Sequence, residues 1–209
     1  MKMNMKVRLA AFSFATLGCT NFALAAGGPL GIDSRLNYDN QGIWKRSNQK
    51  TLQALVIGGE IAGALWEGSD TRLGKTFWQS IDASLVGGAG YLVLNNTLRR
   101  ERPGQTDNPN QWFKSGGHSF PSGEVTAISA AITPFVLEYR RDHPAVYALE
   151  LLPLYDAEAR MKVQGHWQTD VLAGWALGTA AGYYAHSRNQ PFTVMVLPHA
   201  VTVGWHKKF

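Results

Sequence analysis

Residues 159–170 have the sequence Ala-Arg-Met-Lys-Val-Gln-Gly-His-Trp-Gln-Thr-Asp, and this stretch does most to decide the fold and chemistry of the chain. It places Arg160, His166 and Asp170 in the order R-x5-H-x3-D. Residues four positions apart lie on one face of a helix, so we expect the Asp170 carboxylate to contact the His166 imidazole. Such a contact fixes the tautomer and leaves the other ring nitrogen free as a base or nucleophile. Because the guanidinium of Arg160 suits an oxyanion, above all phosphate, the stretch predicts a phosphoryl-transfer site.

Two upstream segments carry residues of the same chemical kind. Arg100-Glu101-Arg102-Pro103 supplies further guanidinium groups, and Gly-His-Ser-Phe-Pro-Ser-Gly-Glu at 117–124 precedes an apolar run. Ser122 is expected to cap a helix that begins there, and Gly123 lets a ligand approach the backbone. Free amides and the positive end of the helix dipole make such a helix start a favourable anion site.

The order and spacing of the three segments resemble the type 2 phosphatidic acid phosphatase superfamily, which includes bacterial class A acid phosphatases and vanadium haloperoxidases. The signature of that family is K-x6-RP, then PSGH, then SR-x5-H-x3-D, and the resemblance extends from about Leu94 to Gly182. The matching residues are Arg102, Ser122, Gly123, Arg160, His166 and Asp170. Three positions depart from the signature: Asn95 stands in the place of the lysine, Glu124 in the place of the second-motif histidine, and Ala159 in the place of the serine.

The resemblance implies a role for each matching residue. His166 would attack phosphorus and become phosphohistidine, while Asp170 would orient and polarise the ring. The phosphate oxygens would be held by the guanidinium groups of Arg102 and Arg160, the hydroxyl of Ser122 and the amide of Gly123. Such a site needs no metal and no other cofactor, because arginines and amides stabilise the charge.

Glu124 occupies the place of the histidine that protonates the leaving oxygen, and three interpretations of it stay open. A protonated Glu124 would serve as the acid, and an ionised one as a base towards water. Glu124 is otherwise a first-turn residue that favours the helix dipole. His118, Lys114 and Lys162 are alternative sources of the missing proton donor or cation, with His118 preferred because it lies in the same loop. Arg100 and Asn95 are possible auxiliary residues.

The N-terminus has the layout of a secretory signal peptide, with basic residues, an apolar stretch at 9–18 and small residues at 23–26. We therefore expect residues 1–25 to be a signal peptide and residues 26–209 a single domain that is periplasmic or secreted, either soluble or attached to the membrane surface. Cys19 offers an alternative as a lipidation site. The leader carries three of the basic residues and no acidic ones, which reduces the net charge from +5 to +2 and argues against a nucleic-acid partner.

The hydrophobic pattern predicts an all-α bundle of about five to six helices with a short C-terminal β-hairpin. The expected helices are 51–66, 73–98, 123–140, 143–155 and 169–187, and the expected strands are 192–197 and 201–205. Residues 99–122 form a long loop with motif residues at both ends, which is typical of a functional loop. Charged residues or proline interrupt each long apolar stretch, so we expect a soluble or peripheral protein, with an integral membrane protein as the alternative.

The sequence thus predicts a phosphatase or phosphotransferase that acts on phosphomonoesters, either lipid phosphates at a membrane surface or small soluble esters. A binding protein that holds a phosphorylated ligand without turnover is the first alternative. A vanadate-dependent haloperoxidase is the second, although the missing family lysine and histidine argue against it.

Overall fold

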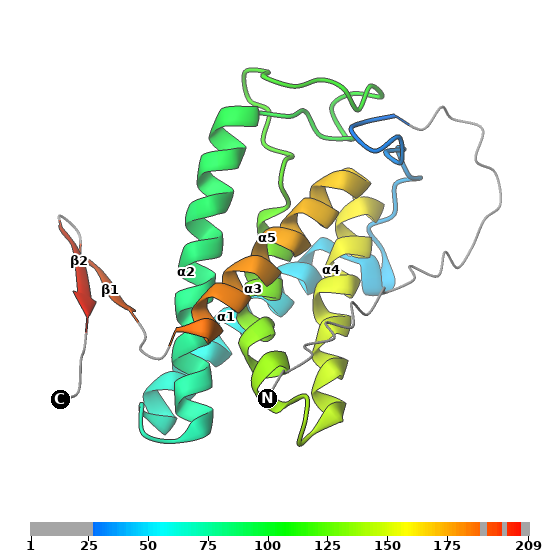
Figure 1. Ribbon diagram of the computed structural model, residues 1–209. Helices are drawn as coiled ribbons and strands as arrows, with labels where there is room; N and C mark the ends of the chain where they lie inside the picture. The colour runs from blue at the N-terminus through cyan, green and yellow to red at the C-terminus, as the bar shows by residue number, and fades with distance from the viewer. Residues whose placement is uncertain (1–26, 189–191, 198–199, 206–209) are drawn as a thin grey trace, which may run out of the picture.

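The computed structural model describes residues 27–188, 192–197 and 200–205, so the expected signal peptide lies outside the described residues. Within the described residues, five α-helices make up the bundle: α1 Arg46–Glu67, α2 Arg72–Leu98, α3 Gly123–Tyr139, α4 Leu151–Lys162 and α5 Gln168–Ser187. Two 3-10 helices, Gly42–Trp44 and Pro144–Glu150, precede α1 and α4. The expected all-α bundle is confirmed (Figure 1).

Helix α3 forms the centre of the bundle, because most of its side chains are buried between α2 and α5. Its contact with α5 is unusually close. A Cβ atom placed on Gly178 would be 2.3 Å from the Thr126 carbonyl oxygen, and one on Gly182 would be 2.4 Å from the Thr133 Cβ. Glycine at these positions therefore lets the α5 backbone pack directly on α3.

A buried polar contact joins α1 and α2. The hydroxyl groups of Ser80 and Ser84 donate to the Glu60 carboxyl group at 2.7 and 3.1 Å. Burial raises the pKa of Glu60 to about 7, and the two serine hydrogen bonds offset only part of that effect.

Two expected helix boundaries are wrong, and His166, expected on a helix with Asp170, lies outside α5. Helix α1 begins at Arg46 instead of residue 51, because the Asn40 side chain accepts a hydrogen bond from the Arg46 amide at 2.7 Å and fixes the first turn. The expected helix 143–155 is a 3-10 helix followed by α4, so Arg160 lies on the last turn of α4. Trp167 is the N-cap of α5, which places His166 before the helix instead of on it.

The N-terminal segment 27–45 crosses the loops at one end of the bundle, next to the long loop 99–122 (Figure 1). It is fixed there by Asp33, which accepts hydrogen bonds from the Arg100 guanidinium, the Thr169 amide and the Thr169 hydroxyl. The loops that carry the expected site are therefore covered by a segment that is distant in sequence.

Strands β1 Phe192–Leu197 and β2 Ala200–Trp205 pair antiparallel. Pro198 and His199, the expected turn between them, lie outside the described residues, and a C-terminal hairpin as part of the fold stays a prediction. None of the helices in the described residues has an apolar stretch long enough to cross a membrane.

Candidate active site

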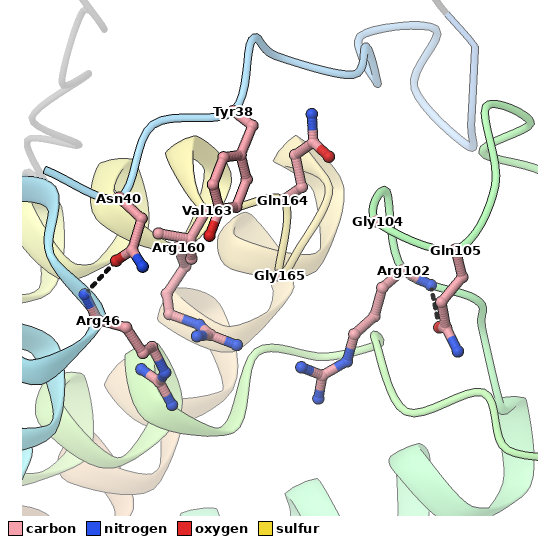
Figure 2. Close-up of a pocket in the computed structure, with 10 residues that line it drawn as sticks. All are labelled: Tyr38, Asn40, Arg46, Arg102, Gly104, Gln105, Arg160, Val163, Gln164 and Gly165. Carbon is pink, nitrogen blue, oxygen red and sulfur yellow. Dashed lines mark hydrogen bonds between the residues drawn. The ribbon is translucent and has the colours of Figure 1, made fainter.

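Three arginines from three separate elements line one cavity of about 420 Å³. Arg46 comes from the first turn of α1, Arg102 from the loop after α2, and Arg160 from the last turn of α4. Figure 2 shows Arg160 and Arg102 extending towards one another, with the guanidinium of Arg46 beside that of Arg160. The remaining lining residues are Tyr38, Asn40, Gly104, Gln105, Val163, Gln164 and Gly165.

Arg160 is almost completely buried, and its guanidinium is held in place on two sides. Its Nε lies 3.4 Å from the Glu124 carboxylate, and its Nη1 lies 3.4 Å from the Gln49 side-chain oxygen. Gly165 packs on the guanidinium, because a Cβ there would be 2.6 Å from Nη2. Burial lowers the pKa of Arg160 to about 10, so the group stays positively charged in the physiological range.

Glu124 forms a two-pronged ion pair with Arg46 that ties the start of α3 to the start of α1. Burial alone would raise the pKa of this carboxyl group. The hydrogen bonds from Arg46 and the positive charges of Arg160, Arg46 and Arg102 outweigh burial and lower the pKa below its ordinary value. A leaving-group acid must hold a proton, so this environment argues against Glu124 as the donor and favours an ionised anchor for the arginines.

His166 presents one nitrogen to the backbone and is neutral. Its Nδ1 lies 2.6 Å from the Ser119 carbonyl oxygen, and since a carbonyl only accepts, Nδ1 carries the hydrogen. Burial lowers the pKa of His166 well below its ordinary value, and the charges of Arg160 and Arg102 lower it further. The unprotonated Nε2 is therefore available as a nucleophile close to the arginine cluster.

Asp170 and His166 lie close together, with 3.9 Å between Asp170 Oδ2 and His166 Nδ1, but the expected hydrogen bond between them is not formed, because Nδ1 is directed to the Ser119 carbonyl. Asp170 is the third residue of α5, and its carboxylate accepts from the Trp167 amide at 2.9 Å and from the Ser119 hydroxyl. Asp170 thus fixes Trp167, which follows His166 in the chain, and Ser119, whose carbonyl oxygen accepts from the His166 ring. Asp170 positions His166 through these two neighbours.

Arg100 has no donor left for a substrate. It is fully buried, and its five N–H groups are directed to Asp33, Asp170, Thr169 and the Pro109 carbonyl. Its guanidinium also lies over the Trp112 ring, 4.5 Å from the centroid. The suggested auxiliary role in phosphate binding is therefore wrong, and Arg100 instead compensates the buried charges of Asp33 and Asp170.

Ser122 is the N-cap residue of α3, as expected, but its hydroxyl makes no capping hydrogen bond. Its hydroxyl is buried and has no hydrogen-bond partner among the described residues. Gly123 packs on Tyr91, where a Cβ would come within 2.9 Å of the ring. The first amides of a helix also lack intrahelical partners, so an unused hydroxyl and unused amides meet at this helix start. Such a set suits an anion.

Asn95, in the place of the family lysine, holds His118. Its amide nitrogen donates to the Phe120 carbonyl at 3.1 Å, which turns its oxygen towards His118 Nδ1 at 2.9 Å. Nδ1 therefore carries a hydrogen and Nε2 is left for proton exchange. Arg102 donates to the His118 carbonyl at 3.1 Å. Lys114 and Lys162, the other suggested replacements, are absent from the lining of this cavity in the described part of the chain.

Arg46 is the residue that the sequence did not indicate. It lies 78 positions before Glu124 and has no motif around it. One signal was present: a carboxylate at the start of an otherwise apolar helix needs a nearby cation. This requirement indicates that a basic residue lies near Glu124, but it does not indicate which one.

The described residues contain no group of three or more histidine, cysteine or acidic side chains that could hold a metal ion. The family model of the PAP2 superfamily, the type 2 phosphatidic acid phosphatases, matches residues 80–193, which is more than half of the chain. No curated protein and no solved structure matches the chain. The family match covers Arg102, Arg160, His166 and Asp170, but it begins at residue 80 and so does not include Arg46.

Proposed function

Because the chain belongs to the PAP2 superfamily, whose members are generally phosphatases, we propose that it hydrolyses phosphomonoesters through a phosphohistidine at His166. The observation that carries this proposal is a neutral, buried His166 whose Nε2 is unprotonated. The positive charges of Arg160 and Arg102 are close enough to lower the pKa of this histidine. These charges would stabilise the phosphoryl group in transfer. The Ser122 hydroxyl and the Gly123 amide would add two donors.

In the first step, His166 Nε2 forms a bond to phosphorus while the bond between phosphorus and the leaving oxygen breaks. His118, protonated at both nitrogens, donates a proton from Nε2 to that oxygen. In the second step, water attacks the phosphohistidine, its proton passes to His118, and His166 is released. An alcohol in place of water would give phosphotransfer. His118 is exposed to solvent, which allows it to exchange protons between turnovers.

The substrate, the location and the metal independence are part of this proposal. The cavity lining is mostly polar, which suits the phosphate shared by small soluble esters and lipid phosphates. The leader-like residues 1–25 support export to the periplasm or beyond. Arginines, a hydroxyl and amides supply the charge stabilisation that a metal supplies elsewhere.

The test is a phosphate-release screen of soluble and lipid phosphomonoesters from pH 4 to 8, with and without chelator. We expect turnover that chelator does not remove, and acid-labile phosphate on His166 in a rapid quench. His166→Ala should abolish both. If wild-type protein binds phosphate or vanadate but releases no phosphate from any ester, the chain is a binding protein, and the departures at Asn95 and Glu124 mark the loss of activity.

A further inference from the structure

We propose that Arg46 is a third phosphate-binding residue, held in its working position by Glu124; this inference rests on the proposed phosphatase function. On this proposal, one positively charged group of the site, the Arg46 guanidinium, lies outside residues 80–193, the region that matches the family model. Glu124 becomes a positioning residue that acts through Arg46.

The backbone and the side chain of Arg46 are both fixed. The Asn40 side chain accepts from the Arg46 amide, and Gln49, one turn further along α1, accepts from the Arg46 guanidinium at 3.0 Å. Glu124 accepts from Nη1 at 2.6 Å and also from Nη2. A planar group held by two such contacts has lost its rotational freedom before any ligand arrives, which favours binding.

Arg46 still has donors to offer. A guanidinium carries five N–H groups, and the contacts with Glu124 and Gln49 use three of them. The Nε–H and one Nη2–H are left on a side chain that lines the cavity and is 30% exposed. Arg100 is the counterexample within the same molecule, since it is fully buried and its five N–H groups are all engaged.

The charges also fit a phosphate dianion. Arg46, Arg102 and Arg160 together with the ionised Glu124 leave two positive charges at the cavity. Asp156, buried behind Arg160, has a pKa raised to about 7 by burial and by Glu124, so it is largely uncharged in the acid range. Without Arg46, the cavity would retain one net positive charge, and the Glu124 carboxylate would keep only the longer ion pair with Arg160 at 3.4 Å.

The test measures equilibrium binding of inorganic phosphate to the full chain by calorimetry, which does not depend on turnover. Loss of a charge-assisted hydrogen bond typically weakens binding about 10- to 100-fold, and we expect Arg46→Ala to fall in that range. Arg46→Lys should recover part of the affinity, because it keeps the charge but not the fork. Glu124→Gln removes a negative charge, which alone would tighten anion binding; we expect weaker binding because Arg46 loses its anchor.

The double variant Arg46→Ala/Glu124→Gln separates the two roles. Arg46→Ala leaves the Glu124 carboxylate with only the longer ion pair to Arg160, so its negative charge should oppose phosphate binding and the added Glu124→Gln should restore part of the affinity. This variant also removes the ion pair completely, which protects the measurement against misfolding of the single variant. The matched control is Arg72→Ala/Glu138→Gln, which removes another arginine–glutamate pair, between α2 and α3, and should leave phosphate affinity unchanged.

The outcomes separate this inference from the proposed function. If Arg46→Ala and Arg46→Lys both bind phosphate like the wild type while Arg160→Ala does not, Arg46 only ties α1 to α3, and the phosphatase proposal stands. If Arg102→Ala and Arg160→Ala also bind phosphate normally, the cavity is not the phosphate site and both proposals fail.

Discussion

Four arginines lie around His166 and Asp170, and their environments divide them into two groups. Arg46, Arg102 and Arg160 line a cavity, whereas Arg100 is fully buried between Asp33 and Asp170. Arg100 and Arg102 stand two positions apart, and only the proline that follows Arg102, which places it in the family signature, distinguishes them in the sequence. In the structure, the two arginines differ in their burial and in their hydrogen-bond partners.

Arg100→Ala should therefore lower stability before it changes phosphate binding. Removal of one partner from a buried ion pair typically costs about 3–5 kcal/mol in the free energy of unfolding. Urea denaturation measures this loss, and Arg72→Ala, which breaks an exposed ion pair, should lose much less. A stable Arg100→Ala protein with weakened phosphate affinity would instead place Arg100 in the phosphate site.

His118→Ala should lower the rate of the phosphorylation step by about 10²–10⁴ for esters with poor leaving groups, because these leaving groups need a proton. With an activated aryl phosphate, whose leaving group needs little protonation, the rate of this step should be nearly unchanged. Asn95→Leu, which removes the acceptor for His118 Nδ1, should act in the same direction but less strongly. The ratio of kcat/KM values for the two substrate types, which reports the phosphorylation step and not the later attack of water, gives the result. Equal losses on both substrates would exclude His118 as the proton donor.

Gly165→Ala should weaken phosphate binding with little effect on the bundle. The added methyl group would lie 2.6–3.2 Å from three guanidinium atoms of Arg160 and push the group out of position. Gly58→Ala on α1 is the matched control, since nothing lies within 4 Å of the new atom there. It should keep normal affinity and add up to about 1 kcal/mol of helix stability. Normal affinity in Gly165→Ala would show that Arg160 tolerates displacement.

At the scale of the elements, helices α3 and α5 depend on glycine for their contact. Gly178→Ala would place a methyl group 2.3 Å from a backbone carbonyl that cannot move without shifting α3. Overpacking of this kind typically costs about 1–3 kcal/mol, and here we expect the upper end. The urea midpoint should fall accordingly, whereas that of Gly88→Ala on α2, where the new atom meets nothing within 4 Å, should not fall. An unchanged midpoint for Gly178→Ala would mean that the two helices are less tightly packed.

The elements differ in how well the sequence predicts them. The start of α3 follows from Pro-Ser-Gly before an apolar run, and its end differs by one residue from the expected one. The start of α4 was missed, because two prolines, Pro144 and Pro153, each suit a first helical turn. Proline removes a donor that only the first turn can spare, so the α-helix begins just before Pro153. Local signals fix one helix start and leave the other ambiguous.

The site follows the same division. Residues within one motif, such as Arg160 and His166, were predicted because their spacing is local. The Asp170 contact was predicted wrongly, because it depends on whether the helix begins before or after His166. The position of Arg46 depends on the packing of α1 against α3, and the contact between Asn95 and His118 depends on the path of the loop that follows α2. Spacing along the chain gives no information on either.

For the molecule as a whole, buried carboxyl groups link stability to pH. The pKa of Glu60 is raised to about 7, so between its ordinary value and pH 7 the folded chain holds a proton that the unfolded chain has released. The stability that this group contributes is complete below the ordinary value and is lost as pH rises through about 7.

Glu60→Gln isolates this effect, because glutamine stays neutral. The difference in unfolding free energy between the variant and the wild type should shift in favour of the variant from pH 5 to pH 8 and then become constant. Urea titrations at each pH give the difference, with Glu158→Gln on the surface of α4 as the control for a change at an exposed carboxyl group. A difference that does not change with pH would show that Glu60 has its ordinary pKa in the folded protein.

The segment 27–45 also determines when, during synthesis, the active site can form. The Asp33 carboxylate pairs with Arg100 and also bonds to Thr169, 136 residues later, so the earliest described part of the chain has its full set of partners only after the start of α5 has been made. Contacts between residues so far apart in the sequence form late in folding, because the intervening chain must first be ordered. A nascent chain that ends before residue 169 therefore lacks the Thr169 contacts that fix segment 27–45. It also lacks the Asp170 contacts that fix Trp167 and Ser119 beside His166, and we expect full phosphate binding only once the start of α5 has been made.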